Sequence, residues 1–345
     1  MRMTRAFAAL TTATAVLAVT ACGSSTSASD DSSSEDALVI YSGRNEKLVG
    51  PLLADLEKAV GSKVEVRYGD SAEMSAQILE EGKGTKADLF LSQDAGALGA
   101  LAKEGRLATL DQSVTDTVLP GYADDDGRWV ATSARARVVV YNPKTAPEVA
   151  QMDEIDDVVD AKYSGRVGVA PTNASFQSFV TALRVVDGED DAKEWLTELK
   201  DNKPTIYEKN GAILQGVEDG EVDLGLINHY YWYELVAEKG ADKVTSKIRF
   251  LNSDDPGALI NVAGVGVIEG TEQSEAATKA VEYLLSKEGQ TYFADTTAEY
   301  PVVEGITSTK HDLPPLTELK GSKVDLNDLD SLPATLDLLS TVGLT

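Results

Sequence analysis

The chain has 345 residues, and its 57 acidic side chains against 31 basic ones give a formal net charge of −26 at pH 7. Such a charge disfavours binding to nucleic acids and anionic lipid surfaces and favours cations, although acidity can also serve solubility alone. The single cysteine, Cys22, has no second thiol for an intrachain disulfide, and two histidines, His229 and His311, are too few for a histidine-rich zinc or copper site.

The N-terminus predicts a lipoprotein signal peptide over residues 1–21. Arg2 and Arg5 form a basic start, and the apolar and small residues 7–20 have the length of a signal-peptide core rather than of a membrane span. The Val-Thr-Ala-Cys that ends at Cys22 resembles the lipobox of bacterial lipoproteins, which implies cleavage before Cys22 and lipidation of that cysteine. A plain secretory signal with an incidental cysteine is the alternative. Loss of both arginines leaves 29 basic residues against 57 acidic ones, a charge of −28.

The segment 22–36 is rich in serine and acidic residues and predicts a flexible tether, because it has almost no apolar surface to bury. The remaining chain, about 310 residues, exceeds the length at which one hydrophobic core usually stops growing, so two lobes are expected. None of its apolar runs is long enough to cross a bilayer.

In the body, short apolar runs alternate with segments of helical periodicity. In the first part, strands are predicted at 37–41, 63–68 and 87–91, and helices at 48–60, 71–81 and after 94. In the second part, strands are predicted at 138–141, 167–170 and 222–227, and helices at 176–186, 192–199 and near 211–214. This alternation predicts an α/β fold with an open, mainly parallel sheet.

Polar segments follow several of these strands, at 42–46, 92–94, 172–175 and 228–231. Ligands of open α/β sheets collect beyond the carboxyl ends of the strands, where loops and helix N-termini converge. These segments therefore predict a binding site.

The usual catalytic signatures are missing from the sequence. It contains no G-x-S-x-G elbow, no H-E-x-x-H pair, no P-loop and no dinucleotide-binding glycine fingerprint. Ser175 has no evident base nearby in the sequence, and no pair of carboxylates stands out. A protein that is not an enzyme is the expectation.

Tyr230 and Tyr231 are the residues that suggest a specific chemistry. Two adjacent side chains can face one cleft only if the backbone leaves the extended form there, and the helix-like sequence after Tyr231 makes such a turn plausible. Paired phenolates are hard oxygen donors suited to a highly charged cation such as Fe(III). An aromatic cluster that covers the start of a helix is the alternative.

Taken together, the motifs resemble those of the ferric-iron-binding proteins of bacterial ABC importers. The likeness covers about residues 37–308. Its principal blocks are 39–44 (Val-Ile-Tyr-Ser-Gly-Arg), 135–143 (Arg-Ala-Arg-Val-Val-Val-Tyr-Asn-Pro), 226–232 (Leu-Ile-Asn-His-Tyr-Tyr-Trp) and 255–259 (Asp-Pro-Gly-Ala-Leu), with support from 287–290 and 298–301.

The resemblance implies a two-lobed periplasmic-binding-protein clamshell of type II, similar to transferrin, with a ligand cleft between the lobes. The N-terminal lobe is expected to comprise 37–137 plus 261–312, and the C-terminal lobe 138–260 plus 313–345. Two chain segments that cross between the lobes, near 137–140 and 261–265, would act as the hinge.

The resemblance also implies the ligands. Tyr230 and Tyr231 match the tyrosine pair that binds Fe(III) in the family. A synergistic anion, phosphate or carbonate, would bind at a helix N-terminus, in agreement with the affinity of such ends for anions. Its expected contacts are Asn173, Ala174, Ser175, Asn210 and Asn228, with Arg44 and Arg137 as countercharges or as partners in a salt bridge between the lobes.

The sequence departs from some family members in three places. Asn45 stands where some have a histidine, Gln93 where some have a glutamate, and Phe176 lies where others add a tyrosine. The N-lobe ligands of those members are therefore not carried over. Glu46, Gln93 and Asp94 remain candidate additional ligands, with helix capping and solvated surface as the alternative.

The predicted function follows from this resemblance. The protein is expected to be a monomer that captures Fe(III) outside the cytoplasm, held to the outer face of the cell membrane by its lipid alone, and to deliver the iron to an ABC permease and its ATPase. A solute-binding protein of the same fold for a small organic cation, such as a polyamine or thiamine, is the alternative, with Tyr230, Trp232 and Tyr233 as an aromatic wall.

Overall fold

The computed structural model describes residues 37–345 except 253, 320 and 323. The predicted signal peptide, the lipidation of Cys22 and the tether up to residue 36 lie outside the described residues. Across the described part of the chain, every helix is too short or too polar to pass through a lipid bilayer.

A single nine-stranded sheet, in the order β2-β1-β3-β9-β4-β7-β5-β6 with β8 paired to β4, runs through the described body. Its strands are β1 (Leu38–Ser42), β2 (Val64–Tyr68), β3 (Leu89–Ser92), β4 (Val130–Tyr141), β5 (Val167–Val169), β6 (Thr205–Ile206), β7 (Leu224–Asn228), β8 (Lys247–Arg249) and β9 (Ile260–Val267). The pairs β1–β2, β1–β3, β5–β6 and β5–β7 are parallel, whereas every pair that involves β4 or β9 is antiparallel. The sheet is thus mixed rather than mainly parallel.

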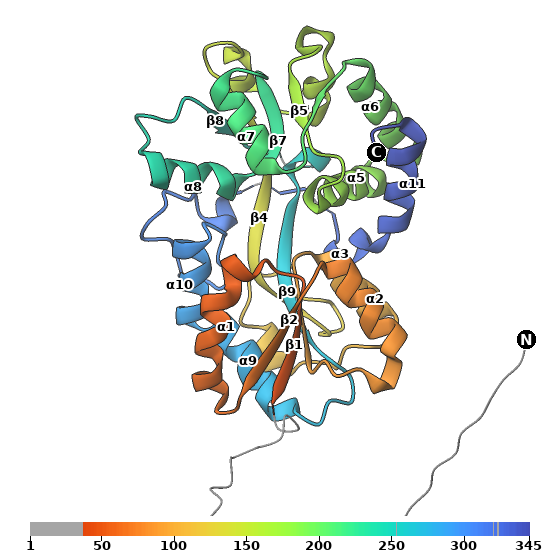
Figure 1. Cartoon of the computed structure of the whole chain (residues 1–345), viewed down its shortest axis with the longest axis vertical. Coiled ribbons are helices and arrows are strands. Elements are labelled where there is room, and N and C mark those ends of the chain that lie inside the picture. The colour runs from red at the N-terminus through yellow and green to blue at the C-terminus, as the bar shows by residue number, and fades with distance from the viewer. Residues whose placement is uncertain (1–36, 253, 320, 323) are drawn as a thin grey trace, which may run out of the picture. The chain divides into compact units, whose positions relative to one another are not determined.

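Strands β4 and β9 divide this sheet into two halves and connect them (Figure 1). From Val130 to Ala136, β4 pairs with β9, and from Arg137 onward it pairs with β7. The half with β1, β2, β3 and β9 belongs to the N-terminal lobe, and the half with β5 to β8 belongs to the C-terminal lobe. The α/β fold with two lobes is confirmed, while the predicted lobe boundaries in residue numbers stay predictions.

Helices cover each half of the sheet (Figure 1). Those of the N-terminal lobe are α1 (Glu46–Val60), α2 (Ser71–Glu81), α3 (Ala95–Lys103), α4 (Gln112–Thr115), α9 (Ser274–Leu285) and α10 (Lys287–Thr296). Those of the C-terminal lobe are α5 (Ala174–Val186), α6 (Glu189–Asp201), α7 (Asn210–Asp219), α8 (His229–Lys239) and α11 (Leu332–Val342).

Helix α1 illustrates how local sequence sets an element. The side chain of Asn45 accepts a hydrogen bond from the Lys47 amide and caps the helix, and Gly61 ends it with a φ of 80°. Its inward face consists of Val49, Leu52, Leu53, Leu56 and Val60. The predicted helix is confirmed and begins two residues earlier.

The C-terminal segment contacts both lobes. Helix α11 packs on α5 and α6, but the 3-10 turn Leu326–Asp330 packs on α3. The Trp129 indole donates a hydrogen bond of 3.1 Å to Asn327 in this turn, and the Leu329 carbonyl lies against Gly96. Residues 313–345 were expected to belong to the C-terminal lobe; this turn contacts α5 of that lobe as well as α3, and the predicted boundary stays a prediction.

Candidate functional site

The tyrosine pair lies where β7 gives way to α8. All residues of β7 are buried, and its last residue, Asn228, pairs with Arg137 of β4. Because α8 begins at once, the backbone leaves the extended form and Tyr230 and Tyr231 turn to the same side. Their rings stack with centroids 4.4 Å apart and planes at 29°.

A polar cluster from three other elements lies beside the pair. The Asn173 side chain caps α5 and accepts hydrogen bonds from the amide and the hydroxyl of Ser175, at 3.1 and 2.7 Å. The Ser175 hydroxyl also accepts from Arg137 at 3.1 Å and from the Asn210 amide group, at the start of α7, at 2.8 Å. The Tyr231 ring borders Gly211, the residue after Asn210. Four of the predicted anion-site residues, Asn173, Ser175, Asn210 and Arg137, thus form one bonded group.

Arg137 has hydrogen-bond donors that no described residue accepts from. Its guanidinium lies 5.7 Å from the centroid of Phe176 and 5.8 Å from that of Phe179, and the residue is only 3% exposed. Its Nε and Nη2 are buried without a partner among the described residues, as is the Oδ1 of Asn210. Burial lowers the pKa of Arg137 to about 9, although the nearby tyrosine hydroxyls act in the opposite direction. Buried donors without partners are costly, so this group is suited to an acceptor ligand.

The N-terminal lobe contributes a second set of buried charges near Tyr230. Arg44 forms a bidentate ion pair with Glu299, with its Nη1 3.0 Å from Oε1 and its Nη2 2.7 Å from Oε2. Glu299 also accepts from the hydroxyls of Ser133 and Thr297. Burial disfavours the charged forms of both residues. The attraction between the two charges outweighs burial, so the pKa of Arg44 is raised and that of Glu299 is lowered. Arg44 is therefore engaged in a salt bridge, within the N-terminal lobe rather than between the lobes.

Arg135 and Glu234 complete the surroundings of Tyr230. Arg135 is buried, donates to the Gln93 carbonyl, and has an Nη1 without a partner among the described residues. Its pKa is lowered, first by burial. Glu234 lies one turn after Tyr230 on α8, and burial, followed by the proximity of Glu299, raises its pKa to about 7. Burial also raises the pKa of Tyr230 well above its ordinary value, with Tyr231 as the next cause.

Sequence reasoning did not assign Arg135, Glu299 or Glu234 to the site. Arg135 and Glu299 stand within blocks that carry the family likeness, and their place in these blocks could have indicated that they belong to the site. Glu234 had the helical spacing of four from Tyr230.

The other predicted residues take different positions. Asn228 is buried at the end of β7, and Ala174 is the exposed first residue of α5. Glu46 is exposed at the start of α1. The pKa of Tyr68 is raised mainly by burial and secondly by the charge of Glu46. Asp94 caps α3 by accepting from the Ala97 amide at 3.0 Å.

Gln93 and Phe176 lie on either side of the arginines. Gln93 is half-buried, and its backbone is bonded within the N-terminal lobe, because its amide donates to Ser71 and its carbonyl accepts from Arg135. Phe176 is fully buried against Arg137.

His229 precedes the pair but has no free nitrogen for a metal. Its Nδ1 accepts from the Ala136 amide at 3.2 Å, and its Nε2 lies 2.9 Å from the Ala298 carbonyl. Burial lowers the pKa of His229 to about 3, so the ring is neutral. Among the described residues, no cluster of three or more His, Cys, Asp and Glu side chains is placed to hold a metal ion.

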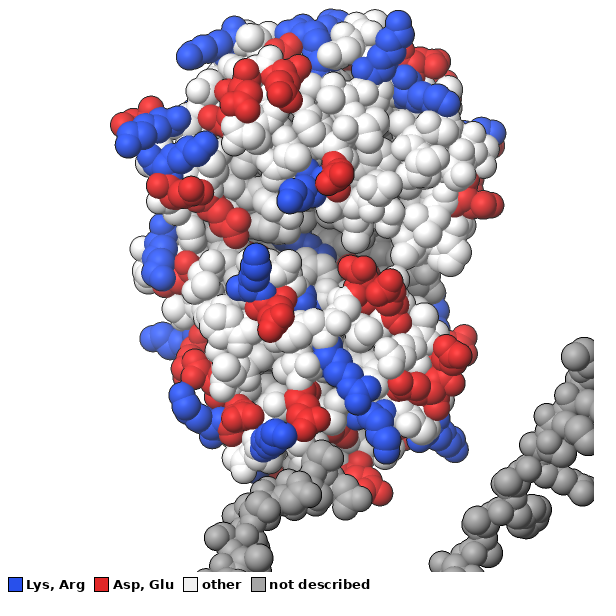
Figure 2. Space-filling model, viewed as in Figure 1, with Lys and Arg blue, Asp and Glu red and all other residues white. Residues whose placement is uncertain are grey.

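Figure 2 shows a hollow across the middle of this face, with basic side chains visible at its bottom.

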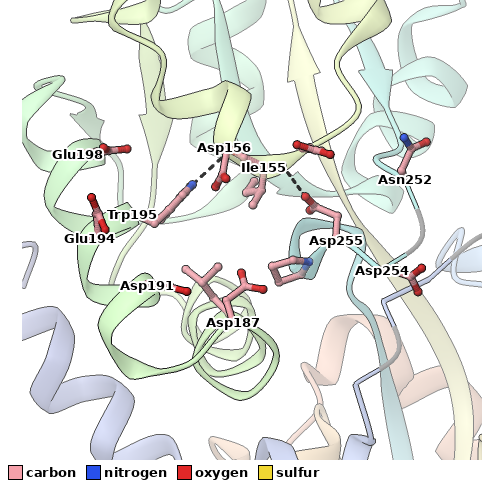
Figure 3. A pocket seen from close by; sticks show the side chains of 13 residues that line it. Ile155, Asp156, Asp187, Asp191, Glu194, Trp195, Glu198, Asn252, Asp254 and Asp255 are labelled. Atoms are coloured by element: carbon pink, nitrogen blue, oxygen red, sulfur yellow. Dashed lines mark hydrogen bonds between the residues drawn. The ribbon is translucent and has the colours of Figure 1, made fainter.

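A separate cavity of about 710 Å³ lies in the C-terminal lobe and is lined by eight carboxylates among its thirteen residues (Figure 3). Hydrogen bonds join Ile155 to Trp195 and to Asp255 in its wall. Burial raises the pKa of Asp255 to about 6 and also raises that of Asp187, with neighbouring aspartates as further causes. The tyrosine pair does not line this cavity.

Comparisons with known proteins agree with this architecture. The chain is 33% identical to the major ferric iron-binding protein of Neisseria meningitidis over 312 residues, covering 89% of this chain and 93% of the relative. The structure of iron-bound HitA from Pseudomonas aeruginosa matches with a TM-score of 0.81 and 34% identity, over 89% of this chain and 99% of that one. A Trichodesmium protein (IdiA, FutA) solved with iron and citrate matches with a TM-score of 0.77 and 26% identity, over 90% of this chain and 100% of that one.

The resemblance to ferric-binding proteins, first recognised in short sequence blocks, is confirmed by these relatives. The profile of the bacterial extracellular solute-binding proteins matches residues 84–325. This is a family of binding proteins rather than of enzymes. The chain belongs to the family of bacterial extracellular solute-binding proteins.

Proposed function

We propose that this protein binds ferric iron between its lobes through Tyr230 and Tyr231, together with a small polyvalent anion, and delivers it to an ABC permease. The single observation that carries the proposal is the tyrosine pair: two stacked phenols at the start of α8, beside a bonded polar cluster with unused donors. The relatives named for ferric iron support the identity of the ion.

The phenols supply the chemistry that Fe(III) needs. Two phenols whose rings stack side by side can bring both oxygens to one cation, and phenolate is a hard anionic donor. Free phenols are neutral at pH 7, since their reference pKa is near ~10. Burial and Tyr231 raise the pKa of Tyr230 further, so iron binding must displace the protons. A soft or singly charged cation would not displace the phenol protons.

The charges around the pair favour an anion as the second component. Fe(III) with two phenolates has a net charge of +1, and the buried Arg135 and Arg137 add two more, while Arg44 and Glu299 cancel. Glu234, with a pKa of about 7, offsets part of one charge. A buried excess of positive charge is unfavourable, so a polyvalent anion would stabilise the loaded site.

The anion would bind against Arg137 and the start of α5. The two unpaired Arg137 nitrogens and the N-terminus of α5 offer donors, and Ser175, Asn210 and Asn228 border the same place. Phosphate and carbonate fit this description, and citrate accompanies iron in the Trichodesmium relative. Gln93, Asp94 and Glu46 remain candidates for further contacts from the N-terminal lobe.

Capture and release would use the two strands that connect the lobes. Iron and anion bind first to the C-terminal lobe, which carries the tyrosines, and rotation about β4 and β9 then excludes water from the site. A membrane permease, powered by its ATPase, would recognise the closed form. We further propose that the mature monomer is held outside the cytoplasm by a lipid on Cys22.

The test is a titration of the signal-less protein with a soluble Fe(III) chelate in phosphate, carbonate and citrate buffers. We expect a one-to-one visible absorption band from iron bound to phenolate, lost in Tyr230→Phe/Tyr231→Phe and retained in Tyr283→Phe on α9. The buffer that gives the strongest band identifies the anion.

No band in any buffer would refute the iron proposal. If, in addition, an organic cation such as a polyamine or thiamine binds equally to wild-type protein and to the double variant, the aromatic wall rather than the phenol oxygens is the site.

A further inference from the structure

The histidine directly before the tyrosine pair joins three separate parts of the chain. His229 is the first residue of α8 and is fully buried. One ring nitrogen bonds to Ala136 of β4, and the other bonds to Ala298, which follows α10. The ring thus connects the helix that carries the tyrosines to a strand shared by both lobes and to a loop of the N-terminal lobe.

The bond to Ala136 lies at the point where β4 changes its neighbour. Ala136 is the last β4 residue paired with β9, and Arg137 is the first paired with β7, opposite Asn228. Continued antiparallel register would place His229 opposite Ala136. There the chain has already turned into α8, and the imidazole Nδ1 accepts the Ala136 amide in place of a backbone carbonyl. The side chain thereby continues the ladder by one bond across the hinge.

The bond to Ala298 fixes the tautomer and a strained loop. Since Nδ1 accepts, Nε2 carries the hydrogen and donates to the Ala298 carbonyl at 2.9 Å. Ala298 has a φ of 51°, a left-handed conformation that a residue with a Cβ adopts at a cost. The next two residues are Glu299, the partner of Arg44, and Tyr300, whose backbone exchanges two 2.8 Å hydrogen bonds with Ala134 of β4.

Aromatic contacts hold the imidazole in this orientation. Tyr300 stacks on it with centroids 4.3 Å apart and planes at 20°, and Tyr230 and Tyr233 meet it edge-on at 5.9 and 6.0 Å. A ring fixed on one face and at two edges, with both nitrogens bonded, cannot rotate without breaking several contacts at once.

From this arrangement we infer that His229 is a positioning residue. It acts as a latch that sets the direction of the Tyr230 phenol and ties it to β4 and to the loop 298–300, so that the closed arrangement of the lobes and the metal-binding arrangement of the tyrosines occur together. This role rests on the proposed iron site. It requires no contact between His229 and the ion, because a small displacement of a coordinating group is enough to weaken binding.

The test compares iron release from wild-type protein, from His229→Phe and from His311→Phe, the same substitution at the only other histidine. Phenylalanine keeps a flat ring to stack on Tyr300 but lacks both nitrogens. The proteins are loaded with an Fe(III) chelate and phosphate, and release to excess chelator is followed at the phenolate–iron band. We expect His229→Phe to release iron about tenfold or more faster, as the loss of one or two hydrogen bonds implies, with a shifted band maximum.

His311→Phe is expected to match the wild type in rate and band. Equal release rates and an unshifted band in His229→Phe would overturn the latch. A wild-type protein without any iron band would instead overturn the proposed function, so the two failures are distinguishable.

A second measurement needs no substitution at His229 and decides the case if His229→Phe fails to fold. In ¹⁵N-histidine NMR of the iron-free wild type, with His311→Phe used only to assign the signals, His229 is expected to carry its proton on Nε2, with Nδ1 accepting a bond. Protonation of Nδ1 instead would overturn the connection to Ala136.

Discussion

Replacement of Arg137 by methionine should stabilise the iron-free protein while weakening its response to anions. Arg137 is 3% exposed, and its Nε and Nη2 have no partner among the described residues. Methionine is flexible, apolar and close to arginine in length, so it fills the space between Phe176 and Phe179 without a charge to bury.

The size of the effect follows from the buried charge. A pKa lowered by burial to about 9 means that the protonated guanidinium is destabilised by about 5 kcal/mol, at about 1.4 kcal/mol per pKa unit. The substitution also removes one hydrogen bond to Ser175 and two contacts with aromatic rings, together about 2 kcal/mol. The net expectation is a gain of about 3 kcal/mol in the free energy of unfolding.

The assay is urea unfolding in a buffer free of iron, phosphate and carbonate. The matched control is Arg184→Met, since Arg184 is also buried but donates to Glu189, Ser331 and Thr335 at 2.8 to 3.2 Å. The loss of these bonds should destabilise the protein by about 2–4 kcal/mol. The same substitution is thus expected to act with opposite signs at the two positions.

Destabilisation by Arg137→Met of more than about 1 kcal/mol would refute the reasoning, because the guanidinium would then be well paired without a ligand. The companion measurement is iron binding with and without phosphate. We expect phosphate to increase the affinity of the wild type by at least about tenfold more than that of Arg137→Met, as the loss of a charged hydrogen bond implies. An equal increase in both proteins would place the anion elsewhere.

Three further outcomes are expected. Glu299→Gln leaves Arg44 buried without its countercharge and should destabilise the protein by about 3–5 kcal/mol in urea unfolding. The double variant Arg44→Met/Glu299→Met should recover most of this loss. If the effects of the two single substitutions simply add in the double variant, the pairing is contradicted. Asp255, with a folded pKa of about 6 above its unfolded value, binds its proton more tightly when folded, so its contribution falls as pH rises from about 4 to 6. Between pH 7 and pH 5 the wild type should therefore gain about 1 kcal/mol more than Asp255→Asn, a figure reduced for solvent screening, and parallel pH curves would exclude this role. Iron loading of the tyrosine pair should release two protons per ion in a weakly buffered titration, and release of one or none would exclude two phenolate ligands.

The sequence predicted most of the elements because their signals are local. The apolar run that ends at Ser42 and the helix capped by Asn45 are confirmed, as is the turn that lets Tyr230 and Tyr231 face the same way. The residues bonded around Ser175 are among those that the family likeness named as contacts of an anion. Its role toward an anion stays a prediction.

The extent of β4 was missed because its first half carries no apolar run. Residues 131–136 are small or polar, yet all of them are buried, since this part of β4 pairs with β9 and is bridged at Ala134 to Tyr300. A strand of this kind is defined by its neighbours rather than by its own side chains. The antiparallel pairing of β4 and β9, which makes the sheet mixed, was hidden for the same reason.

The α/β class, the adjacent tyrosines and the helix starts around them can be read from the amino-acid sequence alone. The fold, in contrast, sets which arginine has a charged partner: Arg44 meets Glu299 across 255 positions of sequence, while Arg137, on the shared strand β4, bonds only to Ser175 and keeps two unpaired donors among the described residues. It likewise decided that His229 is bonded at both nitrogens rather than available to a metal. The physical reason is that capping, periodicity and strand ends depend on near neighbours, whereas burial and the pairing of a charge depend on residues brought together from distant parts of the chain.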